Sequence, residues 1–387
     1  MWEALQILTL SCLILLAYHY LGYLGLLWLG SRLFPHPVAA RSIDMPVSLI
    51  ISAFNEEGVI EEKLRDALQT DYSNLEIVVV TDGSDDATPR LVKGFADQGV
   101  RCLHQPERRG KAAAMNRAAA EANGEILLFS DANAFYRPDA VGRIVANFAD
   151  PNVGCVSGKK TVRRKTADGS WSSVGEAEGV YWRYEAAIKR FESAIASTAG
   201  VVGEMLAVRR SSWRPIPAGV INDDFYICLA IQKLGKRVIY AHDAISWELP
   251  SQSLGDDLKR RQRITAGRFQ ALFNPGWWPW NKPLGLFMLV SHKLLRLLLP
   301  ALFVLALVAN LALLAGPALP NLLMLTLWAQ LAFYGLVVAG SVGYRLDRRW
   351  RLPSICYYIF AGNVGTVRGF MHFLSEEQGV LWEKAAR

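Results

Sequence analysis

The sequence is poor in the residues that build disulfide-rich and zinc-binding proteins. Its 387 residues include only six histidines and five cysteines. The cysteines are odd in number and widely spaced, which argues against a disulfide framework and a cysteine-based zinc motif; they are Cys12, Cys102, Cys155, Cys228 and Cys356. This pattern indicates a soluble part that faces a reducing cytoplasm. The scattered histidines argue against a histidine-based metal site.

Long basic runs and nucleic-acid motifs are also missing, although the net charge is +7. Nucleic acid is therefore disfavoured as a partner. The positive excess favours the positive-inside bias of a membrane protein, with anionic partners such as phosphates or acidic lipid as the alternative. Hydrophobic residues make up 52% of the chain and charged residues 20%. That balance suits a globular domain attached to membrane segments.

Charge is almost absent from the N-terminal segment. Residues 5–30 contain no charged residue apart from His19, which carries a charge only when protonated. The segment could cross a hydrocarbon core of roughly 30 Å. A cleaved signal peptide is the alternative, but the length and the missing basic start argue against it. Arg32 and Arg41 follow, which indicates that the far end is cytoplasmic. We predict a transmembrane helix over residues 1–31.

A second region with little charge lies in the C-terminal third. Residues 298–316 and 321–341 are candidate spans joined by the uncharged "GPALPN". The dense cluster "YRLDRRWR" follows the second span. We therefore predict two transmembrane helices over 298–341, with the short loop outside and the basic cluster inside.

The segments on either side of these spans are less uniform. Residues 276–297 are predicted to form an interfacial helix, because the run contains His292, Lys293 and Arg296. Residues 353–387 are predicted as an interfacial or transmembrane segment, since polar side chains interrupt the run at Asn363, Arg368 and His372. A third feature is an aromatic cluster, interpreted as an interfacial belt with a sugar-stacking platform as the alternative: Trp277, Trp278 and Trp280.

Between residues 46 and 275 short apolar strands alternate with amphipathic helices. This pattern predicts an α/β domain with a parallel sheet covered on both faces. Ligands of such sheets bind at the carboxyl ends of the strands. Polar side chains follow the predicted strands at these ends: Asn55, Glu57, Asp82, Asp85, Asp131 and Asn133.

One sheet edge combines two carboxylates with a lysine. Asp82 and Asp131 end predicted strands, and Lys111 opens a helix behind "RRG". An aspartate at a strand end can ligate a hard divalent cation, which can neutralise a diphosphate. Backbone N–H groups at a helix start, together with a lysine, favour phosphate oxygens. Each aspartate alone could instead be a turn or capping residue, so the hypothesis depends on all three lying together.

Two further segments carry candidate chemistry. In "GVINDDFYICLAIQKLG", Asp223 and Asp224 precede an apolar-periodic helix. Asn222 or Asp223 could cap this helix, or the two aspartates could form a pair in which one carboxylate raises the pKa of the other and yields a general base. In "DDLKRRQRITAGRFQAL", basic residues crowd one helical turn. They could form a solvated face, or grip lipid phosphates or a leaving diphosphate; they are Lys259, Arg260, Arg261 and Arg263.

Taken together these motifs resemble the membrane-bound family-2 glycosyltransferases, which have the GT-A nucleotide-sugar-binding fold. The resemblance covers most of the chain and rests on the order and spacing of short motifs. They are "SAFNEE", "DGSDD", "RRGKAAAMN", "SDAN", "GEMLAVRR", "NDDFYICLAIQKLGKRVIY" and "RRQRITAG", with the flanking apolar segments. Bacterial exopolysaccharide-type transferases with an "RxRIxAG" segment are similar to it.

The resemblance implies a role for each matching residue. Four match positions that hold the donor nucleotide: Asn55, Glu57, Asp82 and Lys111. Asp131 matches the first acid of the D-x-D motif, which binds Mg²⁺ or Mn²⁺ with the diphosphate. Asp224 matches the general base of the T-E-D motif. The segment that contacts the diphosphate contributes Arg260, Arg261 and Arg263. The acceptor side contributes Gly203, Glu204 and Asp223.

Two departures from the family pattern bear on function. Asn133 replaces the second D-x-D acid, so one metal ligand would be a neutral amide oxygen, which hard cations accept. In "RRQRITAG", Arg260 and Ile264 stand where a glutamine and a tryptophan are expected. That tryptophan holds the acceptor sugar in processive synthases, so processivity and acceptor type stay open.

We therefore predict a cytoplasmic GT-A domain over 46–275, held at the bacterial inner membrane by N- and C-terminal helices. The implied function is inverting transfer of a sugar from a nucleotide-diphosphate sugar, with UDP-sugars favoured, to a glycan or lipid-linked acceptor in polysaccharide biosynthesis. A processive synthase coupled to translocation is the alternative. A membrane transporter or scaffold with an inactive nucleotide-sugar-binding domain is the alternative from another class, and a nucleotidyltransferase is a further rival.

Overall fold

The computed structural model describes residues 1–165, 171–173, 176–248, 254–316, 320–346, 348 and 350–375. Within 163–181 and 249–258 it describes the backbone elements alone. Within these residues nine strands form one sheet in the order β3-β2-β1-β4-β8-β6-β9-β5, and β7 pairs with β6. Their bounds are β1 (Val47–Ala53), β2 (Leu75–Asp82), β3 (Val100–Gln105), β4 (Ile126–Asp131), β5 (Ala134–Tyr136), β6 (Val153–Lys165), β7 (Trp171–Ser173), β8 (Leu206–Arg209) and β9 (Arg237–Glu248).

The first half of this sheet is parallel, as the sequence predicts. Strand β1 pairs with β2 on one side and β4 on the other, with Ser52 opposite both Val80 and Asp131. The second half corrects the prediction of a uniformly parallel sheet, because β8 runs antiparallel to β4 and β6, and β5 runs antiparallel to β9. Since β1 lies between β2 and β4, the carboxyl ends of these strands meet at the point where the strand order reverses.

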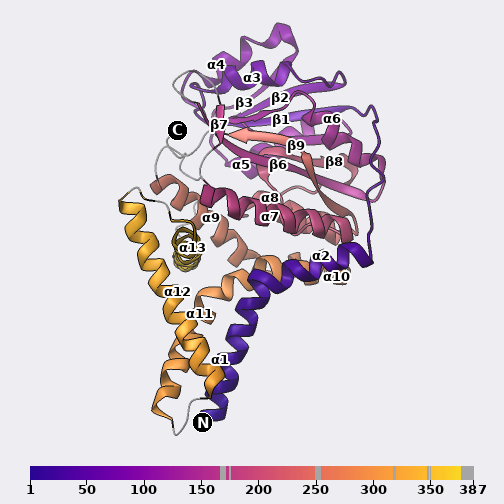
Figure 1. Cartoon of the computed structure of the whole chain (residues 1–387). Helices are drawn as coiled ribbons and strands as arrows, with labels where there is room; N and C mark the ends of the chain where they lie inside the picture. The colour runs from indigo at the N-terminus through magenta and orange to yellow at the C-terminus, as the bar shows by residue number, and fades with distance from the viewer. Residues whose placement is uncertain are drawn as a thin grey trace.

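Helices cover both faces of the sheet (Figure 1). Alternate residues of β1 face opposite cores: Leu49 and Ile51 pack with Ile60 and Leu64 of α3, whereas Ile50 packs with the alanine-rich α5. The domain helices are α3 (Ile60–Leu68), α4 (Thr88–Lys93), α5 (Lys111–Glu121), α6 (Ala140–Val145), α7 (Glu176–Ile195), α8 (Asp223–Lys233) and α9 (Leu254–Leu272).

Three helices in the described part of the chain are long and apolar enough to cross a membrane: Trp2–Leu33, Pro283–Ala315 and Asn321–Arg345. The first contains α1 (Trp2–Ala17), a π-helical turn (Tyr18–Gly22) and α2 (Tyr23–Leu33). The second contains α10 (Pro283–Met288), a π-helical turn (Leu289–Leu294) and α11 (Leu295–Ala312), and the third is α12 (Asn321–Arg345). The N-terminal and two C-terminal apolar helices predicted from the sequence are thus present.

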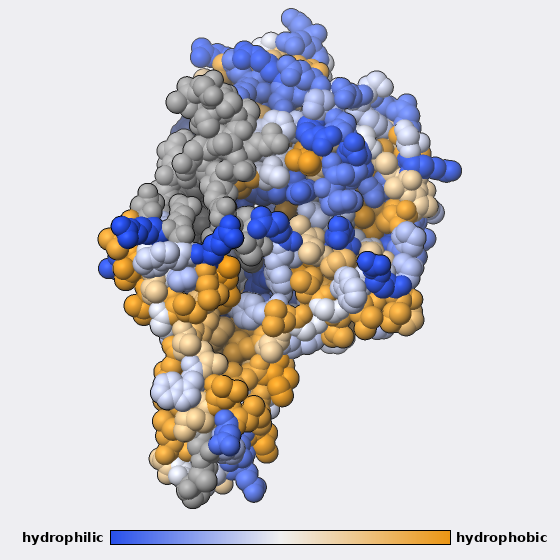
Figure 2. Space-filling view, in the orientation of Figure 1, coloured by the Kyte–Doolittle hydropathy of each residue, from blue (hydrophilic) through white to orange (hydrophobic). Residues whose placement is uncertain are grey.

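These helices form a stalk beneath the domain. In Figure 1, α1, α11 and α12 extend away from the sheet, with the N-terminus at the far end. A Cβ built on Gly316 would lie 3.2 Å from the Trp2 ring, so the chain start and the end of the second apolar helix lie side by side. The stalk surface is mostly hydrophobic, whereas the upper domain is mostly hydrophilic (Figure 2). This division suits a membrane around the stalk.

Two segments differ from a simple span. Residues 283–297 continue into α11 without a break in helical structure, so they are one element with the following apolar helix. Helix α13 (Arg351–Leu374) crosses between α12 and α9 and is seen end-on in Figure 1. A Cβ on its Gly369 would lie 2.6 Å from Cβ of Thr265 in α9, which shows how closely the two helices approach. Whether either segment lies in the membrane interface stays a prediction.

A buried polar cluster joins the stalk to the domain. Glu192 of α7 accepts hydrogen bonds from the Tyr23 hydroxyl at 2.7 Å and the Ala199 N–H at 2.9 Å, and pairs with Nδ1 of His292 at 2.8 Å. Nε2 of His292 lies 3.1 Å from Glu185, which also pairs with Arg296. Because buried charges require partners, this cluster fixes how the two halves meet.

Candidate active site

Asp82, the last residue of β2, holds the loop that precedes α5. Its carboxylate accepts the Arg109 N–H at 2.9 Å and the Gly110 N–H at 2.6 Å. Two glycines make this possible. Gly110 has φ +91°, and a Cβ on Gly83, at φ +69°, would lie 2.5 Å from Cβ of Arg108. Asp82 therefore positions the start of α5 through the loop backbone.

The loops after β1 and β2 are tied together by side chains. Asn55, at φ +53°, donates from its amide to Asp85 at 2.6 Å and accepts the Asp85 N–H at 3.1 Å. The exposed Glu57 accepts the Ala87 N–H at 3.0 Å and donates its own N–H to Asp86 at 3.1 Å. The left-handed backbone of Asn55 thus allows the loops after β1 and β2 to hydrogen-bond to each other. Glu57 lies in the first of these loops, near the carboxyl ends of the strands.

Lys111 joins three of the predicted elements. Its Nζ donates to Oδ1 of Asp131 at 2.7 Å and lies 3.5 Å from Oδ2 of Asp223. Burial lowers the pKa of Lys111, but the two carboxylates outweigh it and hold the pKa above its ordinary value. Lys111, the first residue of α5, therefore stays protonated between the end of β4 and the start of α8.

Asp224 lies beside this cation with a raised pKa. Burial and the neighbouring Asp223 raise the pKa of Asp224 to about 6, against the opposing effect of Lys111 and Arg263. Asn222 precedes α8 but makes no side-chain capping hydrogen bond. A Cβ on Gly203 would lie 3.5 Å from Oδ2 of Asp224, so Gly203 lies directly beside the carboxylate. This environment favours a general base over a pure capping role.

Asn133 follows the end of β4 and is 2% exposed. Its Oδ1 has no hydrogen-bond partner within the described residues. Among those residues no three His, Cys, Asp or Glu side chains gather as a metal-binding group. Asn133 stands two residues after Asp131, so its orphaned amide oxygen and that carboxylate are the two candidate ligands, which fits a site that supplies few protein ligands. A hard cation there would take its other oxygens from a diphosphate and water.

The three arginines of α9 lie against different partners. Arg260 Nη1 lies 2.8 Å from Glu248, Arg261 Nη1 donates to the Tyr358 hydroxyl of α13 at 3.1 Å, and Arg263 Nη1 donates to the Ile221 carbonyl at 3.2 Å. Arg263 thus lies next to the start of α8, and Arg261 connects α9 to α13. The diphosphate role of all three stays a prediction.

The close approach of α9 to the Asp223–Asp224 pair depends on a glycine. A Cβ on Gly267 would lie 2.4 Å from Cβ of Asn222 and 3.1 Å from its backbone nitrogen. Any larger side chain would push the helix away from the carboxylates. This contact explains why a glycine closes the "RRQRITAG" segment.

Sequence reasoning missed a buried ion-pair group beside Glu204. Lys160 Nζ lies 2.5 Å from Glu248 and 3.6 Å from Glu204. Although burial raises it, Lys160 and Arg260 lower the pKa of Glu248 to about 2. Lys160 and Glu248 lie on β6 and β9, which pair in parallel. No local pattern marks either residue, because only the strand pairing brings them together.

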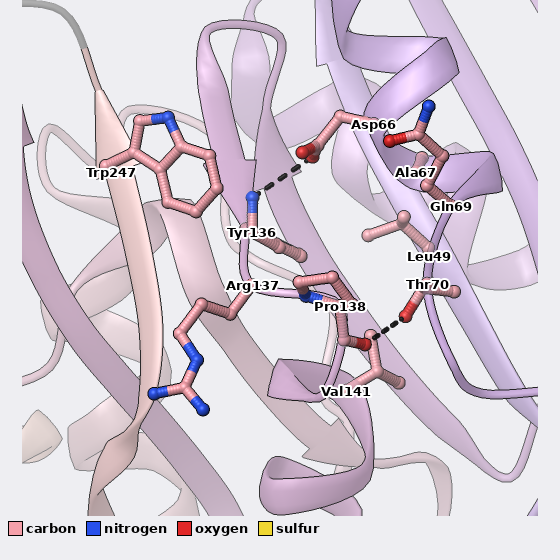
Figure 3. A pocket seen from close by; sticks show the side chains of 10 residues that line it. All are labelled: Leu49, Asp66, Ala67, Gln69, Thr70, Tyr136, Arg137, Pro138, Val141 and Trp247. Carbon is pink, nitrogen blue, oxygen red and sulfur yellow. Dashed lines mark hydrogen bonds between the residues drawn. The ribbon is translucent and has the colours of Figure 1, made fainter. Parts of the chain in front are cut away.

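A cavity of about 180 Å³ lies elsewhere, between the end of α3 and β5 (Figure 3). Its polar groups are used within the fold: Asp66 accepts the Tyr136 N–H at 3.0 Å, and the Thr70 hydroxyl donates to the Pro138 carbonyl at 3.0 Å. None of the predicted site residues lines it. The strand ends, and not this cavity, carry the candidate chemistry.

Part of the chain matches a known protein family. Residues 48–213 match the family model for glycosyl transferase family 2. The chain is 23% identical over 256 residues to poly-beta-1,6-N-acetyl-D-glucosamine synthase of Staphylococcus epidermidis, covering 64% of this chain and 61% of that protein. It is 25% identical over 232 residues to the Staphylococcus aureus (strain MSSA476) synthase of the same name, covering 58% and 55%. The chain spans less than two thirds of the length of these relatives.

Among solved structures, the fold is similar to that of the mannosyltransferase PcManGT from Pyrobaculum calidifontis, described in complex with GDP-Man and Mn²⁺. The TM-score is 0.70 with 24% identity, and the match covers 96% of this chain and 100% of that one. The architecture is therefore the GT-A fold.

The family match and the fold agree: residues 48–213 are similar to glycosyl transferase family 2, and the sheet has the GT-A architecture. The chain is similar to poly-beta-1,6-N-acetyl-D-glucosamine synthases over 58–64% of its length.

Proposed function

We propose that this protein transfers a sugar, with inversion, from a nucleoside-diphosphate sugar to an acceptor hydroxyl in polysaccharide biosynthesis. The observation that carries the proposal is Asp224, whose pKa is raised to about 6 beside the Lys111 cation. A base with that pKa is largely deprotonated at neutral pH and still accepts a proton. A positioned cation stabilises the charge that develops on a leaving diphosphate.

The bond changes follow from this arrangement. The acceptor oxygen attacks the anomeric carbon from the side opposite the diphosphate, and its proton goes to Asp224. A glycosidic bond forms while the bond from the anomeric carbon to the diphosphate oxygen breaks, and the nucleoside diphosphate leaves with the electron pair. Lys111 and Arg263 balance the negative charge at that stage.

We also propose that a divalent cation is required, Mg²⁺ or Mn²⁺. Asp131 and Asn133 would hold it, and when bound it would neutralise charge on the diphosphate. Mn²⁺ accompanies GDP-Man in the structurally similar mannosyltransferase.

The test is a panel of UDP- and GDP-sugars with each cation, using purified full-length protein and sizing of the products. Because the two Staphylococcus relatives are poly-N-acetylglucosamine synthases, UDP-N-acetylglucosamine is the first donor to test. GDP-mannose, from the structurally similar mannosyltransferase, is the second. Single additions would identify a transferase, and long products would identify a processive synthase. No turnover with any donor would favour the scaffold or transporter alternative.

We propose the cytoplasmic face of a bacterial inner membrane as the location of the domain. Arg32 and Arg41 follow the first apolar helix, and the segment 317–320 that joins the second and third apolar helices carries no charge. In a cysteine-less background, Ala318→Cys should react with an impermeant thiol reagent in spheroplasts, and Gln98→Cys, on the domain surface, should not. Reaction of Gln98→Cys in intact spheroplasts would reverse the topology.

A further inference from the structure

A second cavity, of about 370 Å³, lies between β6, α7 and β9. Its walls are basic and aromatic, and the residues that matter here are Lys159, Arg183, Lys189, Arg190, Trp182 and Tyr240. Helix α7, which supplies most of them, packs against α2 through Ile188. The cavity therefore belongs to the part of the domain that meets the stalk (Figure 1).

Lys189 is the central feature of this cavity. Its side chain is buried, with the residue 7% exposed, and its Nζ lies 5.5 Å from the centre of the Tyr240 ring. Within the described residues no carboxylate lies within 4.0 Å of it. Burial lowers the pKa of Lys189, while Glu185, Glu204 and Asp224 act to keep it charged. The stem of Lys189 is buried and the residue lines the cavity, so a bound anion could supply the counter-charge that the protein does not provide at close range.

The other charged residues that line the cavity do not supply a counter-charge for Lys189. Among the described side chains, Lys159, Arg183 and Arg190 also have no carboxylate within 4.0 Å, although the two arginines are exposed to solvent. The nearby Glu185 is already engaged by His292, Lys293 and Arg296. Lys160 is engaged by Glu248. The cavity thus has more positive than negative charge available to a ligand, with Lys189 at its centre.

This cavity adjoins the candidate base. Val202 lines it, and the next residue is Gly203, where a Cβ would lie 3.5 Å from Oδ2 of Asp224. A molecule held in the cavity could therefore extend past the glycine toward Asp224. Lys111 pairs with Asp131 and lies 3.5 Å from Asp223, whereas neither Lys111 nor Asp131 lines the cavity, so the cavity is separate from the proposed donor residues.

We infer that the cavity between β6, α7 and β9 binds a phosphate group of the acceptor, with Lys189 as its main counter-charge. This inference rests on the proposed function and adds the chemical class of the acceptor. The phosphate takes no part in the bond changes; it holds the molecule whose hydroxyl faces Asp224. A lipid phosphate entering from the stalk side and a soluble sugar phosphate share this chemistry.

The experiment measures equilibrium binding to full-length protein in phosphatidylcholine nanodiscs. The probes are farnesyl phosphate, glucose 6-phosphate and, as a neutral control, farnesol. We expect at least one phosphate probe to bind, with Lys189→Met weakening it at least tenfold. The control Lys93→Met, an exposed lysine on α4, should bind like the wild type. Farnesyl phosphate alone binding would identify a lipid acceptor, and glucose 6-phosphate alone a soluble one.

Three results would overturn the inference: no phosphate binding by the wild type, farnesol binding as tightly as farnesyl phosphate, or equal binding by wild type and Lys189→Met. Should Lys189→Met fail to fold, Arg190→Gln at the exposed rim is the second variant, with a weaker loss of a few-fold expected; equal binding there would count against the inference. Donor hydrolysis by the wild type is measured in parallel. Its absence counts against the proposed function, whereas insensitivity of phosphate binding to these variants counts against the cavity alone.

Discussion

Nζ of Lys111 lies 2.7 Å from Oδ1 of Asp131, so the first residue of α5 and the last residue of β4 form an ion pair at the mouth of the sheet. The lysine thus donates to one oxygen of the proposed metal ligand. A cation that binds Asp131 must therefore share the carboxylate with Lys111 or displace it. The lysine would then be available to the diphosphate.

The first prediction concerns the base. Asp224→Asn keeps the size of the side chain and removes its basicity, so transfer should fall by about 10²–10⁴-fold. Donor affinity, measured by calorimetry with the nucleoside diphosphate, should barely change. Asp223→Asn is the matched control and should cost less. Transfer by Asp224→Asn within a few-fold of the wild type would restore the capping interpretation of residues 222–224.

The second prediction concerns pH. A base must be deprotonated to act, and the pKa of Asp224 is about 6, so kcat/KM should rise with pH through about pH 6 and level off above it. Lys111 lowers the pKa of Asp224. Lys111→Met should therefore move the rising limb to higher pH as well as reduce the rate. A limb that stays in place in Lys111→Met would show that another group titrates.

The third prediction concerns the metal. Excess EDTA should abolish transfer, and added Mg²⁺ or Mn²⁺ should restore it, because a diphosphate leaving group needs its charge neutralised. Asn133→Asp should retain transfer with an altered preference between the two cations, since an anionic oxygen replaces a neutral one. Full turnover in EDTA would exclude the requirement. An inactive Asn133→Asp would mean that the amide itself is needed.

The fourth prediction concerns the joint between stalk and domain. Glu192→Ala removes the partner of Tyr23 and His292. Leaving a buried hydrogen-bonding group without its partner typically costs about 1–3 kcal/mol for each group in the free energy of unfolding, measured here by denaturant unfolding in detergent micelles. Glu61→Ala removes the exposed Arg65–Glu61 pair and should cost at most about 1 kcal/mol. Equal losses in the two variants would show that the cluster contributes no more than a surface pair.

Much of the site could be predicted from local patterns. Apolar strands that end in polar residues predicted where Asp82 and Asp131 lie, and adjacency in the chain predicted the Asp223–Asp224 pair. The contacts of Asp82 and Arg261 could not be predicted from local patterns. Asp82 binds the backbone of its own loop, and Arg261 contacts α13, because helix packing decides which side of α9 each arginine faces.

The sequence by itself determined the division into apolar helices and an α/β domain, because hydrophobic periodicity and charge-free runs are local properties. Only the tertiary structure decided that β8 and β5 run antiparallel to their neighbours, that Lys160 pairs with Glu248, and that Lys111 lies between Asp131 and Asp223. These contacts join residues far apart in the chain. Their existence depends on strand register and on close approaches such as Gly267 against Asn222, which no single segment specifies alone.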